Sequence, residues 1–447
     1  MTRITTGKIS RRKFLKLAVG TTALGPFFLF PERVLASQKT LKIAKWAHFL
    51  PEFDHWFASV VAKEWGQKHD TKVTVDVIPI EQVHARAAAE IKAEKGHDVF
   101  MFPWPPAEFY QHVINHAEIY QTVLLKYGQI DRSAYSSVFN SKARQYFAFA
   151  DYWVPAPFHY FEDYWKEVKA PLGPIDWAGL RITGKSLRDK LGIPCGLALS
   201  PTLEGNVTLH TLLIAFNSFV LDRKGDVAIN NARTFDALNY VKYLYQGSGT
   251  PEQLTWSSGG NAKAMLARKT SCTINCISLL RTAEKQDPEV AKKIMLLPPL
   301  PGSRFEIGVP HAVNCSVIWR FAKNQEAAKQ FLGDLIDSSG AGYEQSKGCN
   351  FAFYQKAIPD LIVRLSKDSQ AEPAGKYVVL KDALFWTRNL GAPGFATPAF
   401  METYNTFVIP RMFASVAKGE RSTEDALNAA TAEVQRIVDK WKQIGRS

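Results

Sequence analysis

Apolar residues along the chain switch repeatedly between a period of two and a period near 3.6, and this alternation indicates the class of fold. The elements that it predicts in the first part of the chain are strands at 41–47, 72–78 and 98–102 and helices at 54–69, 81–95 and 107–120. A β-α-β-α-β order is typical of a mainly parallel sheet with helices on both faces. In such a sheet, ligands bind beyond the carboxyl ends of the strands. We therefore predict an α/β fold with its site at that edge.

The same alternation restarts near Asp151 and continues to the end of the chain. The elements expected there are a strand at 195–199 and helices at 206–219, 235–245 and 423–443. The last helix is long and amphipathic, which is typical of a helix with one face on a core and the other in solvent. No repeat or low-complexity segment interrupts the pattern. This second series predicts a second α/β lobe.

The N-terminus has the features of an export signal. Residues 10–16 read SRRKFLK and precede an apolar stretch at 17–30. This order is typical of a twin-arginine signal, and the apolar stretch is shorter than the roughly 20 residues that span a bilayer. We predict that residues 1–36 are removed after Ala36 and that no lipid anchor is added, because no cysteine follows the stretch. An uncleaved N-terminal anchor and a basic helix without a targeting role are the alternatives.

Charge and cysteine content exclude several classes of protein. Without the predicted signal, 48 basic and 41 acidic residues leave a net charge of +7, compared with +13 for the whole chain. The charges are scattered rather than gathered in a basic stripe, so nucleic acid is not an expected partner. The cysteines have no metal, haem or iron–sulfur spacing, so no cofactor is expected. In an oxidising compartment they form either one or two disulfides or buried apolar thiols; they are Cys195, Cys272, Cys276, Cys315 and Cys349.

Aromatic and polar residues follow two predicted strands, at the edge where a ligand belongs. Trp46 and His48 come directly after the first strand, and Trp104 follows the third. Core packing is an equal alternative for Trp46. Asp54 stands at the expected start of a helix, where an N-cap role and ligand contact are both open. We expect His48 and Trp104 in particular to contact a ligand.

Several short segments occur in an order that resembles a known family. They are Pro174 to Leu180 before a helix, Val227 to Asn231, Asn261 to Leu266, Lys323 to Ala328, and Gly391 to Gly394. Together they resemble the extracellular solute-binding proteins of family 1, a group that includes maltose-binding and other sugar-binding proteins. The resemblance runs from about Leu41 to Val438.

This resemblance implies two lobes that close on a ligand by a hinge motion. It implies lobe 1 at residues 37–152 and 312–375, and lobe 2 at residues 153–311 and 376–447. It also implies a monomeric periplasmic protein that delivers its solute to the permease subunits of an ABC importer in the inner membrane. A cleft between the lobes would then hold the solute.

A sugar has apolar ring faces and a rim of hydroxyls, so its site needs aromatic platforms and fixed hydrogen-bonding groups. By this reasoning the further aromatic candidates, near the implied crossings and turns, are Tyr152, Trp153, Trp256 and Trp386. The further polar candidates are Glu204 and Asn206 at a helix start, where free amides favour oxygen ligands, and Asn275. Core packing is the alternative for the tryptophans, and a hinge or core position is favoured for His311.

These observations favour a binding protein for a small polar solute, with a sugar or polyol as the expected ligand. A polyamine, a phosphorylated polyol or another organic solute is the first alternative. A secreted hydrolase is the second, since Glu162, Asp163 and Glu204 offer an acid and a base in principle. The sequence has no Gly-x-Ser-x-Gly elbow, no His-Glu-x-x-His motif and no phosphate loop, so we do not expect an enzyme.

Overall fold

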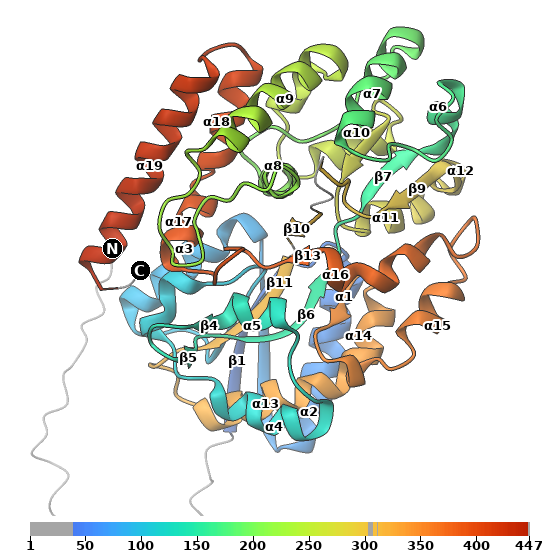
Figure 1. Ribbon diagram of the computed structural model, residues 1–447. Helices are drawn as coiled ribbons and strands as arrows, with labels where there is room; N and C mark the ends of the chain where they lie inside the picture. Colours follow the sequence, from blue (N-terminus) through green and yellow to red (C-terminus); the bar gives the residue numbers. More distant parts are fainter. Residues whose placement is uncertain (1–38, 303–306, 311, 446–447) are drawn as a thin grey trace, which may run out of the picture. The chain divides into compact units, whose positions relative to one another are not determined.

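The largest sheet of the protein has six strands and contains the three strands predicted first as neighbours (Figure 1). This computed structural model describes residues 39–302, 307–310 and 312–445, so the predicted signal at 1–36 and His311 lie outside the described residues. The strand order is β12-β6-β11-β3-β1-β2. The strands are β1 (Lys39–Trp46), β2 (Thr71–Ile78), β3 (Val99–Phe102), β6 (Phe149–Val154), β11 (Ala312–Ile318) and β12 (Phe351–Ala352).

Strand directions in this sheet are mixed, which corrects the prediction of a mainly parallel sheet. β1 is parallel to β2 and to β3, as predicted. β11 is antiparallel to β3 and β6, and β12 is antiparallel to β6. The chain between β6 and β11 forms the whole second series of elements, so no local helical crossover fixes the direction of β11.

The connections between β1, β2 and β3 follow the predicted pattern. The helix predicted at 54–69 is confirmed, with one π turn inside it, and the helix predicted at 81–95 is also confirmed. The observed elements are α1 (Pro51–Trp56), the π turn η1 (Phe57–Val61), α2 (Ala62–Lys68) and α3 (Val83–Ala93).

The single helix predicted at 107–120 is wrong, because two separate elements occupy this region. A 3-10 helix, η3 (Ala107–His112), comes first, and α4 (Ala117–Tyr127) follows after a break. Within the break, Val113 forms a β-bridge with Trp319, and the N–H of Ile114 donates to the carbonyl of Ile318 at 3.1 Å. The backbone therefore satisfies its hydrogen bonds with the chain that leaves β11 instead of within a helical turn.

A second, smaller sheet and a set of helices form the rest of the protein. The sheet is antiparallel with the order β8-β7-β9. Helices α7, α8 and α9 each begin at a residue whose side chain accepts a backbone N–H of the first turn, namely Asp176, Thr202 and Asn231. Such caps stabilise a helix start by about 1 kcal/mol. These elements are β7 (Phe158–Phe161), β8 (Cys272–Ile274), β9 (Ile294–Leu297), α7 (Trp177–Leu191), α8 (Leu203–Ala215) and α9 (Ala232–Ser248).

The strand predicted at 195–199 is wrong, although the segment is extended and buried. Its N–H groups donate to three different segments: Cys195 to the carbonyl of Ser248, Gly196 to that of Cys272, and Leu199 to that of Gln253. A ladder with one neighbouring strand therefore does not form. Apolar composition identified a buried segment here, but not its partners.

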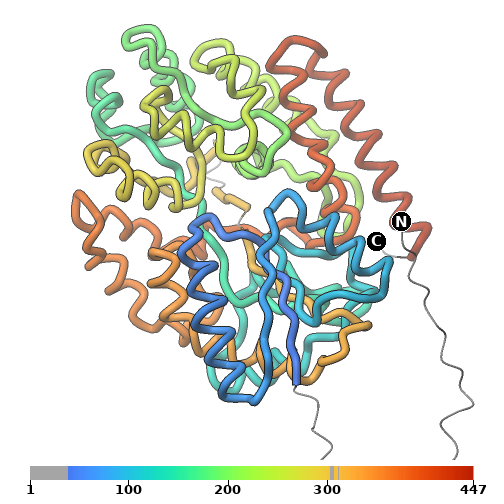
Figure 2. Tube along the Cα trace, turned by 180° about the vertical axis from the view of Figure 1, so that it is seen from behind, coloured from blue at the N-terminus to red at the C-terminus, as the bar shows by residue number. Residues whose placement is uncertain are grey.

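Three helices at the C-terminal end pack against one another, and two of them also pack against α9, one of which contacts α8 as well. They are α17 (Pro398–Asn405), α18 (Val408–Ala417) and α19 (Thr423–Gln443), and the last confirms the helix predicted at 423–443. α17 also packs against η3 beside the large sheet, and Figure 2 shows these red helices next to the light-blue chain of that region. α17 therefore contacts both series of elements.

The other elements are short. They are η2 (Ile80–Gln82), α5 (Arg132–Val138), β4 (Phe139–Asn140), β5 (Gln145–Tyr146), α6 (Glu162–Glu167), η4 (Pro251–Leu254), α10 (Gly260–Leu266), α11 (Ser278–Gln286), α12 (Pro288–Lys293), β10 (Val309–Pro310), α13 (Gln325–Leu335), η5 (Ile336–Ser338), α14 (Ser339–Gln345), η6 (Gln355–Ala357), α15 (Leu361–Ser366), η7 (Lys376–Asp382), α16 (Ala383–Trp386) and β13 (Thr387–Arg388).

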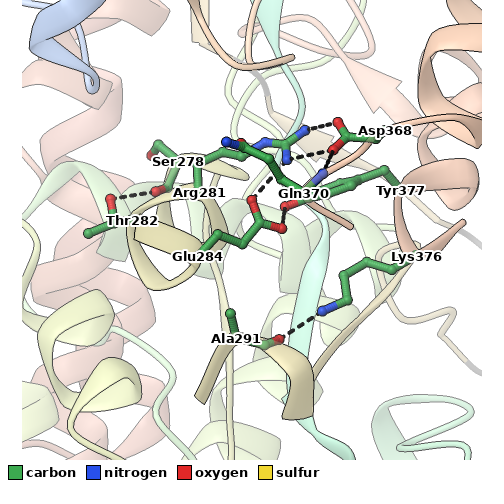
Figure 3. A network of polar contacts seen from close by, with 9 residues as sticks. All are labelled: Ser278, Arg281, Thr282, Glu284, Ala291, Asp368, Gln370, Lys376 and Tyr377. Atoms are coloured by element: carbon green, nitrogen blue, oxygen red, sulfur yellow. Dashed lines mark hydrogen bonds and ion pairs between the residues drawn. The ribbon is translucent and has the colours of Figure 1, made fainter. Parts of the chain in front are cut away.

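A buried charged network fastens α11 to the chain that follows α15 (Figure 3). The guanidinium of Arg281 donates to Glu284 at 2.9 Å and, through two bonds of 2.5 and 3.2 Å, to Asp368. It also lies 3.9 Å from the ring centre of Tyr377, whose hydroxyl donates to Glu284 at 2.7 Å. Only 3% of the Arg281 side chain is exposed. Because every charge here has a partner, we assign this network a structural role.

Buried titratable groups make the stability of the fold depend on pH. Burial lowers the pKa of His48 and His159 to about 3, and that of His116 and His210 to about 4. These histidines stay neutral in the folded protein near pH 5, but each takes up a proton on unfolding, since an unfolded histidine has a pKa of about 6.5. Burial raises the pKa of Asp151 to about 7, so Asp151 releases a proton on unfolding in the same range.

We expect the free energy of unfolding to decrease as the pH falls from about 6.5 to about 4.5. Uptake of a proton by each of the four histidines, less the proton that Asp151 releases, contributes about 4 kcal/mol per pH unit to this slope near pH 5. Urea unfolding at several pH values in this range measures the slope. In the control Asp151→Asn the opposing proton is absent, so the slope should be steeper by about 1.4 kcal/mol per pH unit. A stability that is constant or increases toward acid pH contradicts this expectation.

Candidate functional site

A narrow cleft lies between segments that leave the large sheet and helices of the second series. Phe49 follows β1 and Trp104 follows β3, so one wall stands at the strand ends where the sequence predicts a site. The opposite wall comes from α8, α17 and the chain after β8. The residues that line the cleft are Phe49, Pro103, Trp104, Val154, Ala156, Leu203, Glu204, Val207, Ile274, Asn275, Cys276, Pro310, Ala312, Leu390 and Tyr404.

Trp104 is held at the wall by a histidine. Its indole Nε1 donates a hydrogen bond of 2.7 Å to Nε2 of His84, on the first turn of α3. The two rings are nearly parallel, with centroids 5.6 Å apart and planes within 14°. The ring of Tyr404, from α17, lies 6.4 Å away. The cleft therefore has two neighbouring aromatic rings whose positions are set by different elements.

Glu204 provides an acceptor with unused capacity. It lies in the first turn of α8, and its Oε1 accepts the backbone N–H of Gly259 at 2.8 Å. Its Oε2 is inaccessible to solvent and has no hydrogen-bond partner among the residues that the structure describes. A buried carboxylate oxygen without a donor is unfavourable. A ligand hydroxyl or amine in the cleft would supply that donor.

Asn275 and Cys276 line the cleft after β8, but their polar groups are already used. The Asn275 amide donates to Asn261 at 3.1 Å, and its oxygen accepts the N–H of Cys276 at 2.8 Å. The Cys276 sulfur lies 2.8 Å from the hydroxyl of Ser278. Burial raises the pKa of Cys276 to about 11, so this residue is a neutral thiol rather than a nucleophile.

Trp46 and His48 lie behind the cleft wall rather than on it. Trp46 is fully buried and donates to Asn314 at 2.7 Å, and Asn314 donates in turn to Asp151 at 2.8 Å. In His48, Nδ1 accepts the N–H of Leu50 at 3.1 Å, which leaves Nε2 to donate to Asn350 at 2.9 Å. These bonds fix the loop after β1. They therefore position Phe49, which does line the cleft.

Asp54 and Tyr152 lie beside the same loop. Asp54 forms an ion pair with the buried Lys45 and accepts the backbone N–H of His48 at 2.9 Å. Asp54 thus acts within the fold, and it is not the N-cap of α1, whose cap position is Leu50. Tyr152 is half-buried, and its hydroxyl has no partner in the described part of the chain.

The remaining candidates do not line the cleft. Trp153 is buried and packs against Phe351 and Phe353, with ring centroids 5.4 and 6.1 Å away. Trp386 is buried in α16. Asn206 is buried, and its amide donates to the carbonyl of Tyr404 at 2.9 Å. Trp256 is half-buried on the loop whose Gly259 binds Glu204.

Two cleft aromatics were missed by the sequence reasoning. Phe49 carries a usable signal, because it follows β1 as His48 does, but it is not among the predicted site residues. Tyr404 carries no local signal. Its place in the cleft depends on the packing of α17 against η3 and on the bond from Asn206, which is about two hundred positions earlier in the chain.

Within residues 39–302, 307–310 and 312–445, no group of three or more His, Cys, Asp or Glu side chains is placed to hold a metal ion. In the same ranges, no helix combines the length and apolar character needed to cross a bilayer.

The fold and the cleft define the class of two-lobed periplasmic binding proteins. Residues 50–335 match the family of bacterial extracellular solute-binding proteins, and the chain belongs to that family. It is therefore a solute-binding protein, not an enzyme, which confirms the resemblance and the fold predicted from the sequence. No curated protein matches the sequence.

Solved structures show the same fold at low sequence identity. An ABC transporter solute-binding protein from Thermotoga lettingae, bound to α-D-tagatose, has 17% identity and a TM-score of 0.73, over 90% of this chain and 100% of that chain. A maltose-bound protein from T. maritima has 16% identity and a TM-score of 0.72, over 89% and 99% of the two chains. An Agrobacterium radiobacter solute-binding protein in complex with ribitol has 17% identity and a TM-score of 0.69, over 89% and 98%.

We expect Trp104→Ala and Trp153→Ala to have opposite effects. Trp104 lines the cleft, so its loss should weaken ligand binding by about 1 to 3 kcal/mol with little change in stability. Trp153 is a core residue, so its loss should reduce the free energy of unfolding by about 3 to 5 kcal/mol. Titration calorimetry and urea unfolding measure the two effects. Wild-type affinity in Trp104→Ala would show that this ring is not part of the site.

Proposed function

We propose that this protein is the periplasmic binding component of an ABC importer for a small sugar or polyol. The observation that carries the proposal is the unpartnered Oε2 of Glu204 in a cleft that also holds the rings of Trp104 and Tyr404. Aromatic rings cover the apolar faces of a sugar, and a carboxylate oxygen accepts from its hydroxyls. Proteins of the same fold that hold tagatose, maltose and ribitol support this choice of ligand.

The proposed lobes are residues 37–152 with 312–375, and residues 153–311 with 376–447. These bounds imply three crossings between the lobes, and the crossings near Ala156 and Pro310 both line the cleft. A rotation about such segments would open and close the cleft without disturbing either sheet. The proposed mechanism is therefore capture of the solute by closure, followed by delivery of a monomeric complex to the permease subunits.

An organic amine is the second candidate ligand, and one observation favours it. Among the described residues that line the cleft, none is Lys, Arg or His, so the carboxylate of Glu204 has no cation beside it there. A protonated amine would provide that charge, and the rings of Trp104 and Tyr404 would add cation–π contacts. Substitution of Glu204 therefore distinguishes a sugar or polyol ligand from an amine ligand.

We expect a neutral sugar or polyol to raise the melting temperature of the protein, because a ligand that binds only the folded state stabilises it. The test is a thermal-shift screen of sugars, polyols, polyamines and amino acids, followed by calorimetry. Glu204→Gln should weaken binding of a neutral ligand about tenfold, through loss of one charge-assisted hydrogen bond. Glu289→Gln, at a carboxylate that is 78% exposed, is the matched control. If only amines bind, and if Glu204→Gln abolishes that binding, the ligand is an amine rather than a sugar or polyol.

The proposed route of export is the twin-arginine pathway, with cleavage after Ala36. The basis is the SRRKFLK segment and the short apolar stretch after it. Replacing Arg11 and Arg12 by lysine should keep the positive charge but abolish export, so the protein should be lost from the periplasmic fraction. N-terminal sequencing of the exported wild type should begin at Ser37. Normal periplasmic levels of the double variant would exclude this route.

A further inference from the structure

A chain of hydrogen bonds runs from the cleft to helix α17 through residues that do not line the cleft. It begins at Trp104, whose indole Nε1 donates to Nε2 of His84 at 2.7 Å. The other ring nitrogen of His84 lies 3.0 Å from Oε1 of Glu108, in η3. The same Oε1 accepts the side-chain amide of Asn405, the last residue of α17, at 3.0 Å.

The chemistry of each group fixes the direction of the bonds. An indole N–H only donates, so Nε2 of His84 must accept and Nδ1 must carry the proton that goes to Glu108. Glu108 is then the common acceptor for His84 and Asn405. The two rings are also nearly parallel, with planes within 14° of each other, so the bond relates the orientation of the indole ring to that of His84.

This chain of hydrogen bonds joins the two walls of the cleft through residues that do not line it. His84 and Glu108 belong to α3 and η3, beside the large sheet, whereas Asn405 belongs to α17, which packs with α18 and α19. Tyr404, next to Asn405, lines the cleft. Any movement of one wall relative to the other must therefore stretch or break the bond between Glu108 and Asn405.

We propose that His84, Glu108 and Asn405 are positioning residues for ligand binding: His84 orients the indole of Trp104, and the bond between Glu108 and Asn405 holds the two walls in the arrangement that the structure shows. The proposal rests on the proposed function in one respect, namely that Trp104 contacts the ligand. An aromatic side chain that is already fixed loses less entropy when a ligand stacks on it. A cleft whose walls are already joined also spends a larger fraction of time in the binding-competent state.

The test compares two substitutions of His84 and one of Asn405 with a surface control. His84→Leu removes the acceptor, His84→Gln keeps an acceptor for Trp104 and a donor for Glu108, and Asn405→Leu removes only the far bond. His55→Leu, at an exposed histidine of α1, is the control. The probes are ribitol, maltose and tagatose in calorimetry. The nitrogen-15 NMR signal of the Trp104 indole N–H, assigned with Trp104→Phe, is recorded without ligand.

We expect His84→Leu to shift the Trp104 indole signal and to weaken binding of the probe that binds by about 3- to 10-fold. His84→Gln should keep the wild-type signal and affinity. Asn405→Leu should weaken binding while leaving the indole signal in place, and its effect should not add to that of His84→Leu, because the two residues act in one chain of bonds.

Three results would overturn the proposal: an unchanged indole signal in His84→Leu, a His84→Gln variant as defective as His84→Leu, or fully additive effects of His84→Leu and Asn405→Leu. If His84→Leu does not fold, the comparison of His84→Gln with Asn405→Leu decides in its place. Failure of all three probes to bind the wild type would count against the proposed sugar or polyol ligand. The indole signal would then still decide whether His84 orients Trp104.

Discussion

The buried ammonium of Lys45, at the end of β1, constrains the chain that builds one wall of the cleft. A buried charge is strongly unfavourable unless an opposite charge meets it. The chain after β1 therefore turns back and brings the carboxylate of Asp54 onto Lys45, while the rings of Phe53 and Phe57 lie 5.0 and 5.7 Å from the ammonium. Burial lowers the pKa of Lys45, and Asp54 opposes that shift. The turn that results carries Phe49 into the cleft.

Two other charged residues, Arg281 and Glu204, differ in whether the protein itself pairs their charge. The charge of Arg281 is matched by two carboxylates and by a tyrosine ring, although its buried Nε has no hydrogen-bond partner among the described residues. Glu204 is matched on one oxygen only. A buried group with unused hydrogen-bonding capacity carries a cost that a ligand removes on binding. The site of a binding protein requires such a group with unused hydrogen-bonding capacity, and it does not require a set of catalytic residues.

Local sequence predicted many of the elements because their determinants are local. Capping residues such as Asn231 and Ser422 mark the starts of α9 and α19, and the strands β1 to β3 follow from short apolar runs. The failures at 107–120 and 195–199 have one cause. In both segments the backbone hydrogen bonds go to residues distant in the chain, so the period of the apolar pattern does not report the structure.

The sequence by itself determined the fold class, the family and the edge of the sheet that carries Trp104, because strand order and apolar period are written along the chain. It also gave Glu204 and Asn275, which line the cleft. Only the tertiary structure decided that Trp46 and Trp153 are buried behind the site, and that Tyr404 and His84 belong with it. The physical reason is that a tryptophan has the same local signature in a core and in a cleft. Which of the two it occupies depends on what distant segments place against it.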